Sequence, residues 1–310
     1  MVYIDFLENE EELSFYSLRK YWKIVNKVRL MYYKFFRKVI STSLEDKTVV
    51  LLPKLDSRSF KKLEQKLLQM NSKTVCLSKK LENNDTLKDF LNEKNKDILD
   101  GKWLFSYLIE HILAYIEKQT EENISEQEIA ILTNEIDEKI AGWIIKLACK
   151  YKKIELITKE PLKFKKLEEN LYNEYGIELN VTYNERKSLK NAGIVLNFNF
   201  AEEALNKFSI SKNAIIINFE QEIAIENRSF NGIIVNGYHI HLPTNYFKYV
   251  IPFQKFSNNL IYESLIYKKT NFNNVLKQIL DDNVELHYLI GIRGKIKNQE
   301  FKRRKKLLTN

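Results

Sequence analysis

The sequence predicts two α/β domains, the second a mostly parallel sheet, joined by a long helix. Three observations carry this prediction. Short apolar runs rich in β-branched residues alternate with helix-like runs along the 310 residues. Gly (8) and Pro (4) are scarce, which argues against long flexible linkers. Hydrophobic and charged contents of 44% and 29% are those of a globular chain.

The first predicted domain covers residues 1–118. It begins with one long helix over 13–40, where no Gly or Pro occurs and apolar residues recur at helical spacing. A β-α-β unit follows, in which Ser57 is the expected cap of its helix. Residues 100–118 are predicted as the long connecting helix. The shorter elements expected between them are strands at 48–53 and 74–78, a helix at 58–69 and a short helix within 83–95.

The second predicted domain covers residues 119–259, and residues 260–310 are expected to add helices and a basic tail. Nearly all-apolar strands separated by helices indicate a parallel sheet that is covered on both faces. Gly176 is placed to end a helix with a positive φ angle. The expected strands are 129–132, 154–158, 177–181, 193–197, 214–218 and 232–236; the expected helices are 140–150, 164–175, 201–207, 260–268, 272–280 and 300–310.

The rhythm from Glu128 to Pro243 is Rossmann-like, typical of an NAD(P)-binding fold, but its phosphate loop is degenerate. Where such folds carry G-x-G-x-x-G, residues 133–138 read TNEIDE. The carboxylates of Glu135, Asp137 and Glu138 would repel a pyrophosphate at a helix N-terminus. The sequence therefore argues against NAD(P), and it predicts no other cofactor.

The order of elements over 48–243 resembles shikimate dehydrogenase and methylene-tetrahydrofolate dehydrogenase. Residues 187–197, KSLKNAGIVLN, are similar to the segment of that family beside the nicotinamide. The resemblance implies a two-domain oxidoreductase, from which the glycine-free turn departs. The runs LLPK at 51–54, DGKWL at 100–104 and FNGI at 230–233 also resemble an uncharacterised family of clostridia-like bacteria. That resemblance implies a cytoplasmic bacterial protein and supplies no activity. The heavy use of Lys, Asn and Ile indicates the AT-rich genome of a low-GC bacterium.

Amide side chains gather at the predicted strand ends, where parallel sheets bind ligands. Such uncharged side chains could bind a polar ligand by hydrogen bonds. Asn is, however, also favoured at the ends of strands for conformational reasons. No Walker loop, G-x-S-x-G, H-E-x-x-H or C-x-x-C motif occurs, so catalytic residues stay unassigned. The ligand-binding candidates are Asn134, Asn197, Asn199, Asn218 and Asn236.

Metal binding is not predicted. His239 and His241 point to one side if the segment is extended, but no third ligand is evident near them in the sequence. Cys76 and Cys149 lie in apolar runs and are interpreted as buried small hydrophobic residues.

The net charge of +9 is concentrated at the two ends of the chain. Such ends attract acidic proteins, nucleic acid or anionic surfaces, or else form a solvated helix face and a tail. The N-terminal excess comprises Arg19, Lys20, Lys23, Lys27, Arg29, Lys34, Arg37 and Lys38, with no acid between residues 13 and 40. The C-terminal candidates for a basic surface are Lys302, Arg303, Arg304, Lys305 and Lys306.

Three functional hypotheses follow. The first is a non-catalytic Rossmann-like binding or regulatory protein, favoured by the glycine-free turn. The second is an oxidoreductase-like enzyme with an unconventional ligand site at the strand ends. The third is a binder of nucleic acid or anionic surfaces through the basic ends. An acidic N-terminus and the lack of an apolar run of about 18 residues predict a cytoplasmic protein with no transmembrane segment.

Overall fold

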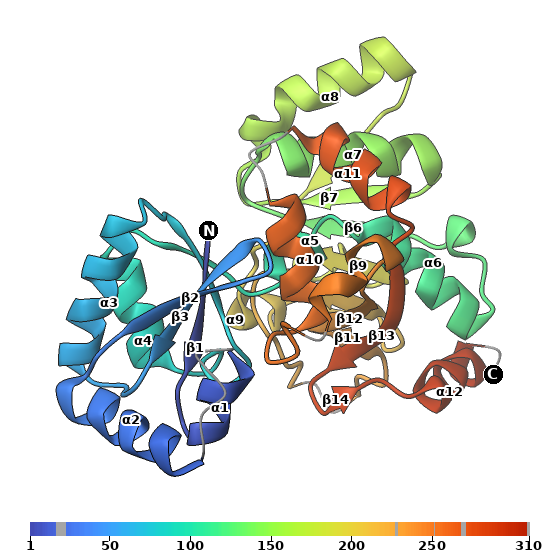
Figure 1. The fold of residues 1–310 in the computed structure, drawn as a ribbon. Coiled ribbons are helices and arrows are strands. Elements are labelled where there is room, and N and C mark those ends of the chain that lie inside the picture. The colour runs from blue at the N-terminus through green and yellow to red at the C-terminus, as the bar shows by residue number, and fades with distance from the viewer. Residues whose placement is uncertain (17–22, 227–228, 251, 268–270, 309–310) are drawn as a thin grey trace. The chain divides into compact units, whose positions relative to one another are not determined.

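The computed structural model describes residues 1–16, 23–226, 229–250, 252–267 and 271–308 (Figure 1). Among these, the side chains of Lys23 and of residues 305–308 lie outside the description. The chain forms two compact units. Unit 1 comprises Met1–Trp103 and Leu242–Lys268, and unit 2 comprises Leu104–His241 and Lys269–Asn310. Residues 242–268 therefore belong to unit 1, although residues 104–241 of unit 2 precede them in the sequence.

Unit 1 contains a five-stranded sheet in the order β2-β3-β1-β4-β5. The neighbours β3, β1, β4 and β5 are parallel, and β2 pairs antiparallel with β3. Ligand crevices of such sheets lie beyond the carboxyl ends of strands whose connections diverge, which here are β1 and β4. The strands are β1 (Val2–Phe6), β2 (Ile40–Leu44), β3 (Lys47–Leu52), β4 (Thr74–Leu77) and β5 (Asp97–Leu99).

The long helix predicted over 13–40 is wrong. Two helices, α1 (Glu10–Phe15) and α2 (Lys23–Phe36), take its place, and strand β2 begins at Ile40. Arg37 ends α2 in the left-handed region, with φ 48°. Strand β1 was missed because its apolar residues surround a buried Asp5 and precede an acidic run. Arg19 and Lys20 of the predicted basic helix lie outside the described residues.

The remaining helices of unit 1 cover its sheet. The side chain of Asp56, rather than Ser57, caps α3 (Ser57–Gln69) by accepting a hydrogen bond from Ser59 N. Helices α3 and α4 (Asp85–Glu93) bury leucines against Val2, Ile4, Val50 and Leu52 of the strands. The segment 242–268, which contains helix α10 (Asn258–Ile266) and the 3₁₀ turn η2 (Thr244–Tyr249), places the rings of Phe253 and Phe256 4.7 and 5.0 Å from that of Tyr3.

Unit 2 is a Rossmann-like α/β unit. Its six-stranded parallel sheet has the order β11-β10-β9-β6-β7-β8. Counted from its first strand this order is 6-5-4-1-2-3, which is the doubly wound dinucleotide-binding order read from the other edge. The strands are β6 (Ile129–Leu132), β7 (Ile154–Ile157), β8 (Asn180–Thr182), β9 (Ile194–Asn197), β10 (Ile215–Asn218) and β11 (Ile233–Val235). The predicted fold class is confirmed, although β8 begins later than the strand expected at 177–181.

Helices follow the first, second and fourth strands of the unit 2 sheet along the chain, β6, β7 and β9. Gly176 ends α8 with φ 67°, which confirms its predicted role. Pro161 opens the same helix. The helices are α6 (Ile109–Thr120), α7 (Glu138–Lys150), α8 (Pro161–Tyr175), α9 (Glu202–Leu205), α11 (Phe272–Asp281) and α12 (Asn298–Leu308), with a 3₁₀ turn η1 (Ile124–Glu126).

Two further features of the structure differ from the prediction. The helix expected over 100–118 is interrupted between α5 (Lys102–Phe105) and α6, where the carbonyl of Ser106 accepts a 2.7 Å hydrogen bond from the Trp143 indole. A small antiparallel sheet of β12 (Gly237–His241), β13 (Glu285–Gly291) and β14 (Gly294–Lys295) was not predicted. Strand β13 follows β12 only after 43 intervening residues. The two strands are therefore too far apart in the sequence to be recognised as a hairpin.

Candidate functional site

The topological crevice of unit 2 lies beyond the carboxyl ends of β6 and β9, from which the chain winds in opposite directions. The glycine-free turn after β6 is stabilised by its own side chains. The hydroxyl of Thr133 donates to the carbonyl of Glu135 at 2.8 Å and accepts from its N–H at 3.2 Å. The turn therefore keeps a fixed shape without the glycines of a phosphate loop.

The N-terminus of α7, where a pyrophosphate would bind in a dinucleotide site, carries this chain's own carboxylates. Asp137 caps the helix by accepting a 2.7 Å hydrogen bond from Ile140 N. Glu138 accepts a 3.0 Å hydrogen bond from the backbone N of Phe272, whose ring lies against Gly142 of α7. Negative charge and hydrogen bonding at this helix start are thus supplied from within unit 2.

Asn134 and Asn199 join the two sides of the crevice. The side-chain oxygen of Asn199 accepts from the backbone N of Asn134 at 3.0 Å. The side-chain oxygen of Asn134 in turn accepts from Lys159 N at 2.9 Å, beyond the end of β7. These two predicted candidates therefore tie together the loops that follow β6, β7 and β9.

The other three candidates form an amide ladder across neighbouring strand ends. Asn197 donates to the Asn218 side-chain oxygen at 3.0 Å, and Asn218 donates to that of Asn236 at 2.7 Å. The outer rungs close loops, because Asn197 exchanges two bonds with the backbone of Phe200 and Asn236 two with that of Ile223. Three of the predicted ligand-binding candidates thus contact one another at neighbouring strand ends. Asn197 and Asn218 are each only 2% exposed, with their amide hydrogen bonds directed within the protein.

The equivalent crevice of unit 1, beyond β1 and β4, contains buried charges. The ammonium of Lys255 lies 3.3 Å from Asp5 and 2.9 Å from Glu12, and Lys80 lies 2.9 Å from Glu12. Tyr16 donates to Asp5 at 2.6 Å, and burial, followed by the charge of Asp5, raises the pKa of Tyr16. The backbone of Lys255 also accepts a hydrogen bond from Lys79 N, so segment 242–268 closes this crevice. Sequence reasoning missed this cluster because its members are far apart in the chain.

The predicted basic surface at the C-terminus is only partly formed. Lys302 and Arg303 are exposed, whereas the side chains of Lys305 and Lys306 lie outside the described residues. Arg304 is a correction, because it is 2% exposed. Its guanidinium forms an ion pair with Glu122 and donates to the carbonyl of Asn213 at 2.6 Å. Arg304 therefore anchors α12 to the rest of unit 2 and contributes nothing to a basic surface.

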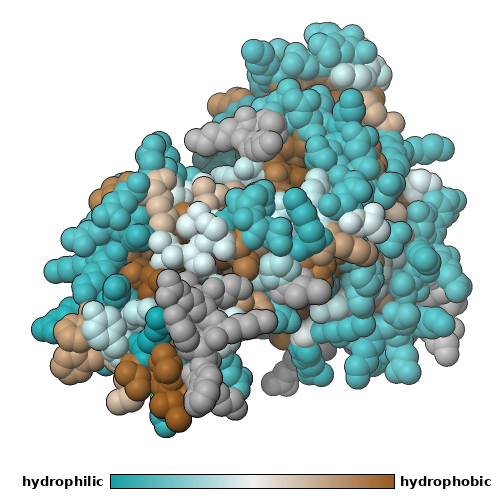
Figure 2. Space-filling view, in the orientation of Figure 1, coloured by the Kyte–Doolittle hydropathy of each residue, from teal (hydrophilic) through white to brown (hydrophobic). Residues whose placement is uncertain are grey.

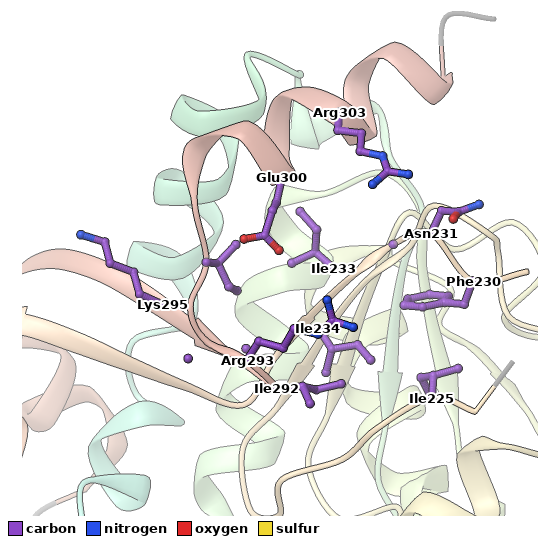
Figure 3. Close-up of a pocket in the computed structure, with 14 residues that line it drawn as sticks. Ile225, Phe230, Asn231, Ile233, Ile234, Ile292, Arg293, Lys295, Glu300 and Arg303 are labelled. Carbon is purple, nitrogen blue, oxygen red and sulfur yellow. The ribbon is translucent and has the colours of Figure 1, made fainter. Parts of the chain in front are cut away.

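A cavity of about 390 Å³ lies between the start of β11, the β13–β14 turn and α12 (Figure 3). We call it the hairpin cavity. Arg293 and Arg303 line it together with Lys295, and Glu300 projects between them from α12. Figure 3 shows Arg303 on the side of Asn231 and Lys295 on the opposite side. The Glu300 carboxylate accepts a hydrogen bond from Lys297 N at the start of α12. The apolar part of the lining comprises Ile225, Phe230, Ile233, Ile234, Ile292 and Ile296.

The predicted histidine pair has a third histidine beside it, and one of the two cysteines differs from expectation. His287 of β13 lies beside the predicted pair, with ring centres 4.2 Å from His241 and 5.7 Å from His239. Within the described part of the chain, no three His, Cys, Asp or Glu side chains are arranged to hold a metal ion. Cys76 is buried, and desolvation raises the pKa of its thiol. Cys149 is exposed, contrary to prediction, because it lies on the outward face of the last turn of α7.

Comparison with known proteins adds no family. No protein-family model matches the chain, and no curated protein resembles it significantly. Among solved structures, L-tryptophan dehydrogenase from Nostoc punctiforme is 12% identical, with a TM-score of 0.34, and the match covers 91% of this chain and 80% of that one. Shikimate 5-dehydrogenase from Listeria monocytogenes is 12% identical, with a TM-score of 0.32, covering 90% and 95%. Ornithine carbamoyltransferase from Campylobacter jejuni is 10% identical, with a TM-score of 0.30, covering 91% and 87%. The fold assignment rests on the strand order itself.

Proposed function

We propose that the chain is a non-catalytic Rossmann-like binding protein. One observation carries the proposal: the amides at the carboxyl ends of the unit 2 strands are hydrogen-bonded to one another and to their own loops. Doubly wound sheets hold cofactor and substrate at this edge. A ligand there would have to replace buried hydrogen bonds, and leaving such groups unpaired costs about 1–3 kcal/mol each.

The helix start and the second crevice support the same proposal. Asp137 and Glu138 place negative charge where a dinucleotide would place its pyrophosphate. In unit 1, Lys255 is held by Asp5 and Glu12 rather than being free to bind an anion. Internal contacts at both crevices thus support the proposal.

We further propose that the hairpin cavity binds a small anion with an apolar body. The guanidinium groups of Arg293 and Arg303 suit a carboxylate or phosphate, to which arginine makes paired hydrogen bonds. The isoleucines and Phe230 of the lining offer a surface for an alkyl or aromatic body. The cavity's volume of about 390 Å³ lies within the range of ordinary small-molecule pockets.

A thermal-shift titration tests both parts of the proposal. The probes are NAD⁺, NADH, NADP⁺ and NADPH on one side, and octanoate, indole-3-acetate and inorganic phosphate on the other. We expect no stabilisation by the dinucleotides and stabilisation by an organic acid, which at 100 times its Kd amounts to about 2.7 kcal/mol. Arg293→Ser should remove this stabilisation. Lys302→Ser, an exposed change on α12 outside the cavity lining, should preserve it.

Each part fails on a different result. Stabilisation by a dinucleotide that Asn197→Leu abolishes would reject the non-catalytic reading and favour the oxidoreductase-like alternative. The hairpin cavity would be rejected as the binding site if none of the organic acids stabilised the chain, or if they stabilised the Arg293→Ser variant equally.

A further inference from the structure

Helix α2 presents its apolar side chains to the outside. Ile24, Val28, Met31 and Phe35 are 72%, 61%, 64% and 73% exposed. Their spacing of four, three and four residues places them in one stripe along the helix. Figure 2 shows hydrophobic side chains gathered over the position of α2, at the lower left of the view. Val25, Tyr32 and Phe36, also exposed, widen the stripe on one side.

The inward face of α2 is the more polar one. Asn26 is 2% exposed and donates a 2.9 Å hydrogen bond to the Ser14 hydroxyl of α1. Leu30 is also buried, and Lys34 donates to the carbonyl of Glu8 at 2.8 Å. A surface helix of a globular protein normally turns its apolar stripe inward, so this arrangement is inverted. Contiguous exposed apolar surface of this kind marks an interaction site.

The charges beside the stripe select the partner. Between residues 13 and 40 the sequence has eight bases and no acid. Lys27 and Lys38 are exposed in the described part of this segment. A second copy of the same helix would bring like charges together. Basic side chains flanking an apolar face rich in aromatic rings are typical of helices that lie in the interface of an anionic bilayer.

We propose that α2 docks unit 1 onto the surface of an anionic lipid bilayer, with the stripe Ile24–Val28–Met31–Phe35 inserted below the headgroups and the flanking lysines among them. A helix of 14 residues is about 21 Å long, which is too short to cross the hydrocarbon core of a bilayer. No helix in the described residues has the length and apolar character of a membrane span. The helix therefore lies in the plane of the interface.

The test is co-sedimentation of the full chain with vesicles of phosphatidylcholine containing one quarter phosphatidylglycerol, and with vesicles of phosphatidylcholine alone. We expect binding to the anionic vesicles, weakened in 0.5 M salt because screening removes the electrostatic contribution. The double variant Met31→Ser/Phe35→Ser should bind about a hundredfold more weakly, since each buried side chain of this size is worth about tenfold or more. Lys27→Glu should weaken binding to anionic vesicles specifically.

Leu162→Ser is the matched control, because Leu162 is an apolar side chain 86% exposed on helix α8 of unit 2. It should bind vesicles like the unmodified chain. The proposal is overturned if the chain does not sediment with anionic vesicles at low salt, or if the Met31→Ser/Phe35→Ser variant sediments equally well. Light scattering after gel filtration measures the oligomeric state, which tests the alternative that the stripe binds a second copy of the chain. A dimer that this double variant dissociates would assign the stripe to a second copy and overturn the lipid assignment.

Discussion

Helices α2 and α12 are the two most basic segments of the molecule, and they are attached to their units in opposite ways. Among the described side chains of α12, Phe301 has no exposed surface and the anchoring Arg304 is 2% exposed. In α2 the inward side chains are Asn26 and Leu30, while its larger apolar residues face outward. One helix buries a charge and the other exposes its apolar surface.

This difference teaches that the number of basic residues does not identify a binding surface. Arg304 is buried because its guanidinium meets a carboxylate, a side-chain amide and two backbone carbonyls, which offset the cost of taking it out of water. In α2, Lys34 donates to the single carbonyl of Glu8, and Lys27 is exposed. The exposed apolar side chains, rather than the density of charge, make α2 the candidate interaction surface.

The largest expected effect is that of Arg304→Met. It removes the cation that pairs with Glu122 and donates to the carbonyl of Asn213, and breaking a buried ion pair from one side costs about 3–5 kcal/mol. Chemical denaturation should show the loss, and hydrogen exchange should localise it to α12 and the start of unit 2. Lys302→Met, an exposed neighbour, should change stability by no more than about 0.5 kcal/mol. Equal stabilities of the two variants would remove the distinction between the helices.

A matched pair within α2 should give a smaller effect. Leu30→Ala removes a side chain that is only 7% exposed and should cost about 2 kcal/mol. Phe35→Ala removes a larger side chain that is 73% exposed, so it should change stability by no more than about 0.5 kcal/mol. Denaturation midpoints of the two variants measure the contrast. A greater loss from Phe35→Ala than from Leu30→Ala would mean that the outward stripe has a partner within the chain.

Much of unit 2 was predictable from the sequence because most of its strands are short and apolar, and β6, β9 and β10 are fully buried. Each one from β6 to β11 stands as a separate β-branched run between polar segments, and Gly176 marks a helix end by its conformation alone. The sequence also predicted Asn197 and Asn218 at strand ends, which lie at one edge of a parallel sheet, and the two side chains are hydrogen-bonded there. What these amides bind did not follow, because loop closure and ligand binding call for the same residue type.

The features that were missed depend on contacts between distant residues. Strand β1 contains a buried Asp5, whose partners Tyr16 and Lys255 are 11 and 250 residues further along the chain. Ser106 lies in a helix-like sequence, but its carbonyl accepts a hydrogen bond from the indole of Trp143 where the helix is interrupted. The inward face of α2 is decided by α1, to which Asn26 is bound, whereas periodicity reports only that one face is apolar. A sequence pattern shows that a helix has one apolar and one polar face, but it does not show which face points into the protein.

The smallest expected effect is a dependence on pH that separates the support of α2 from that of α12. Helix α2 rests on α1, whose Glu12 is buried. Burial alone would raise the pKa of Glu12, but hydrogen bonds from Lys80 and Lys255 outweigh it and hold the pKa below its usual 4.5. A carboxyl group whose pKa is lowered by folding stabilises the folded state at pH values above its pKa in the unfolded chain. This contribution is lost as the pH falls through its pKa in the folded chain.

Hydrogen exchange of residues 8–16, corrected for the intrinsic rate, should therefore show loss of protection below pH 4.5. Glu12→Gln should remove this step, because the amide does not titrate. A step of the same size in that variant would place the acid sensitivity elsewhere in unit 1, and α1 would then not be the pH-dependent support of the outward-facing helix.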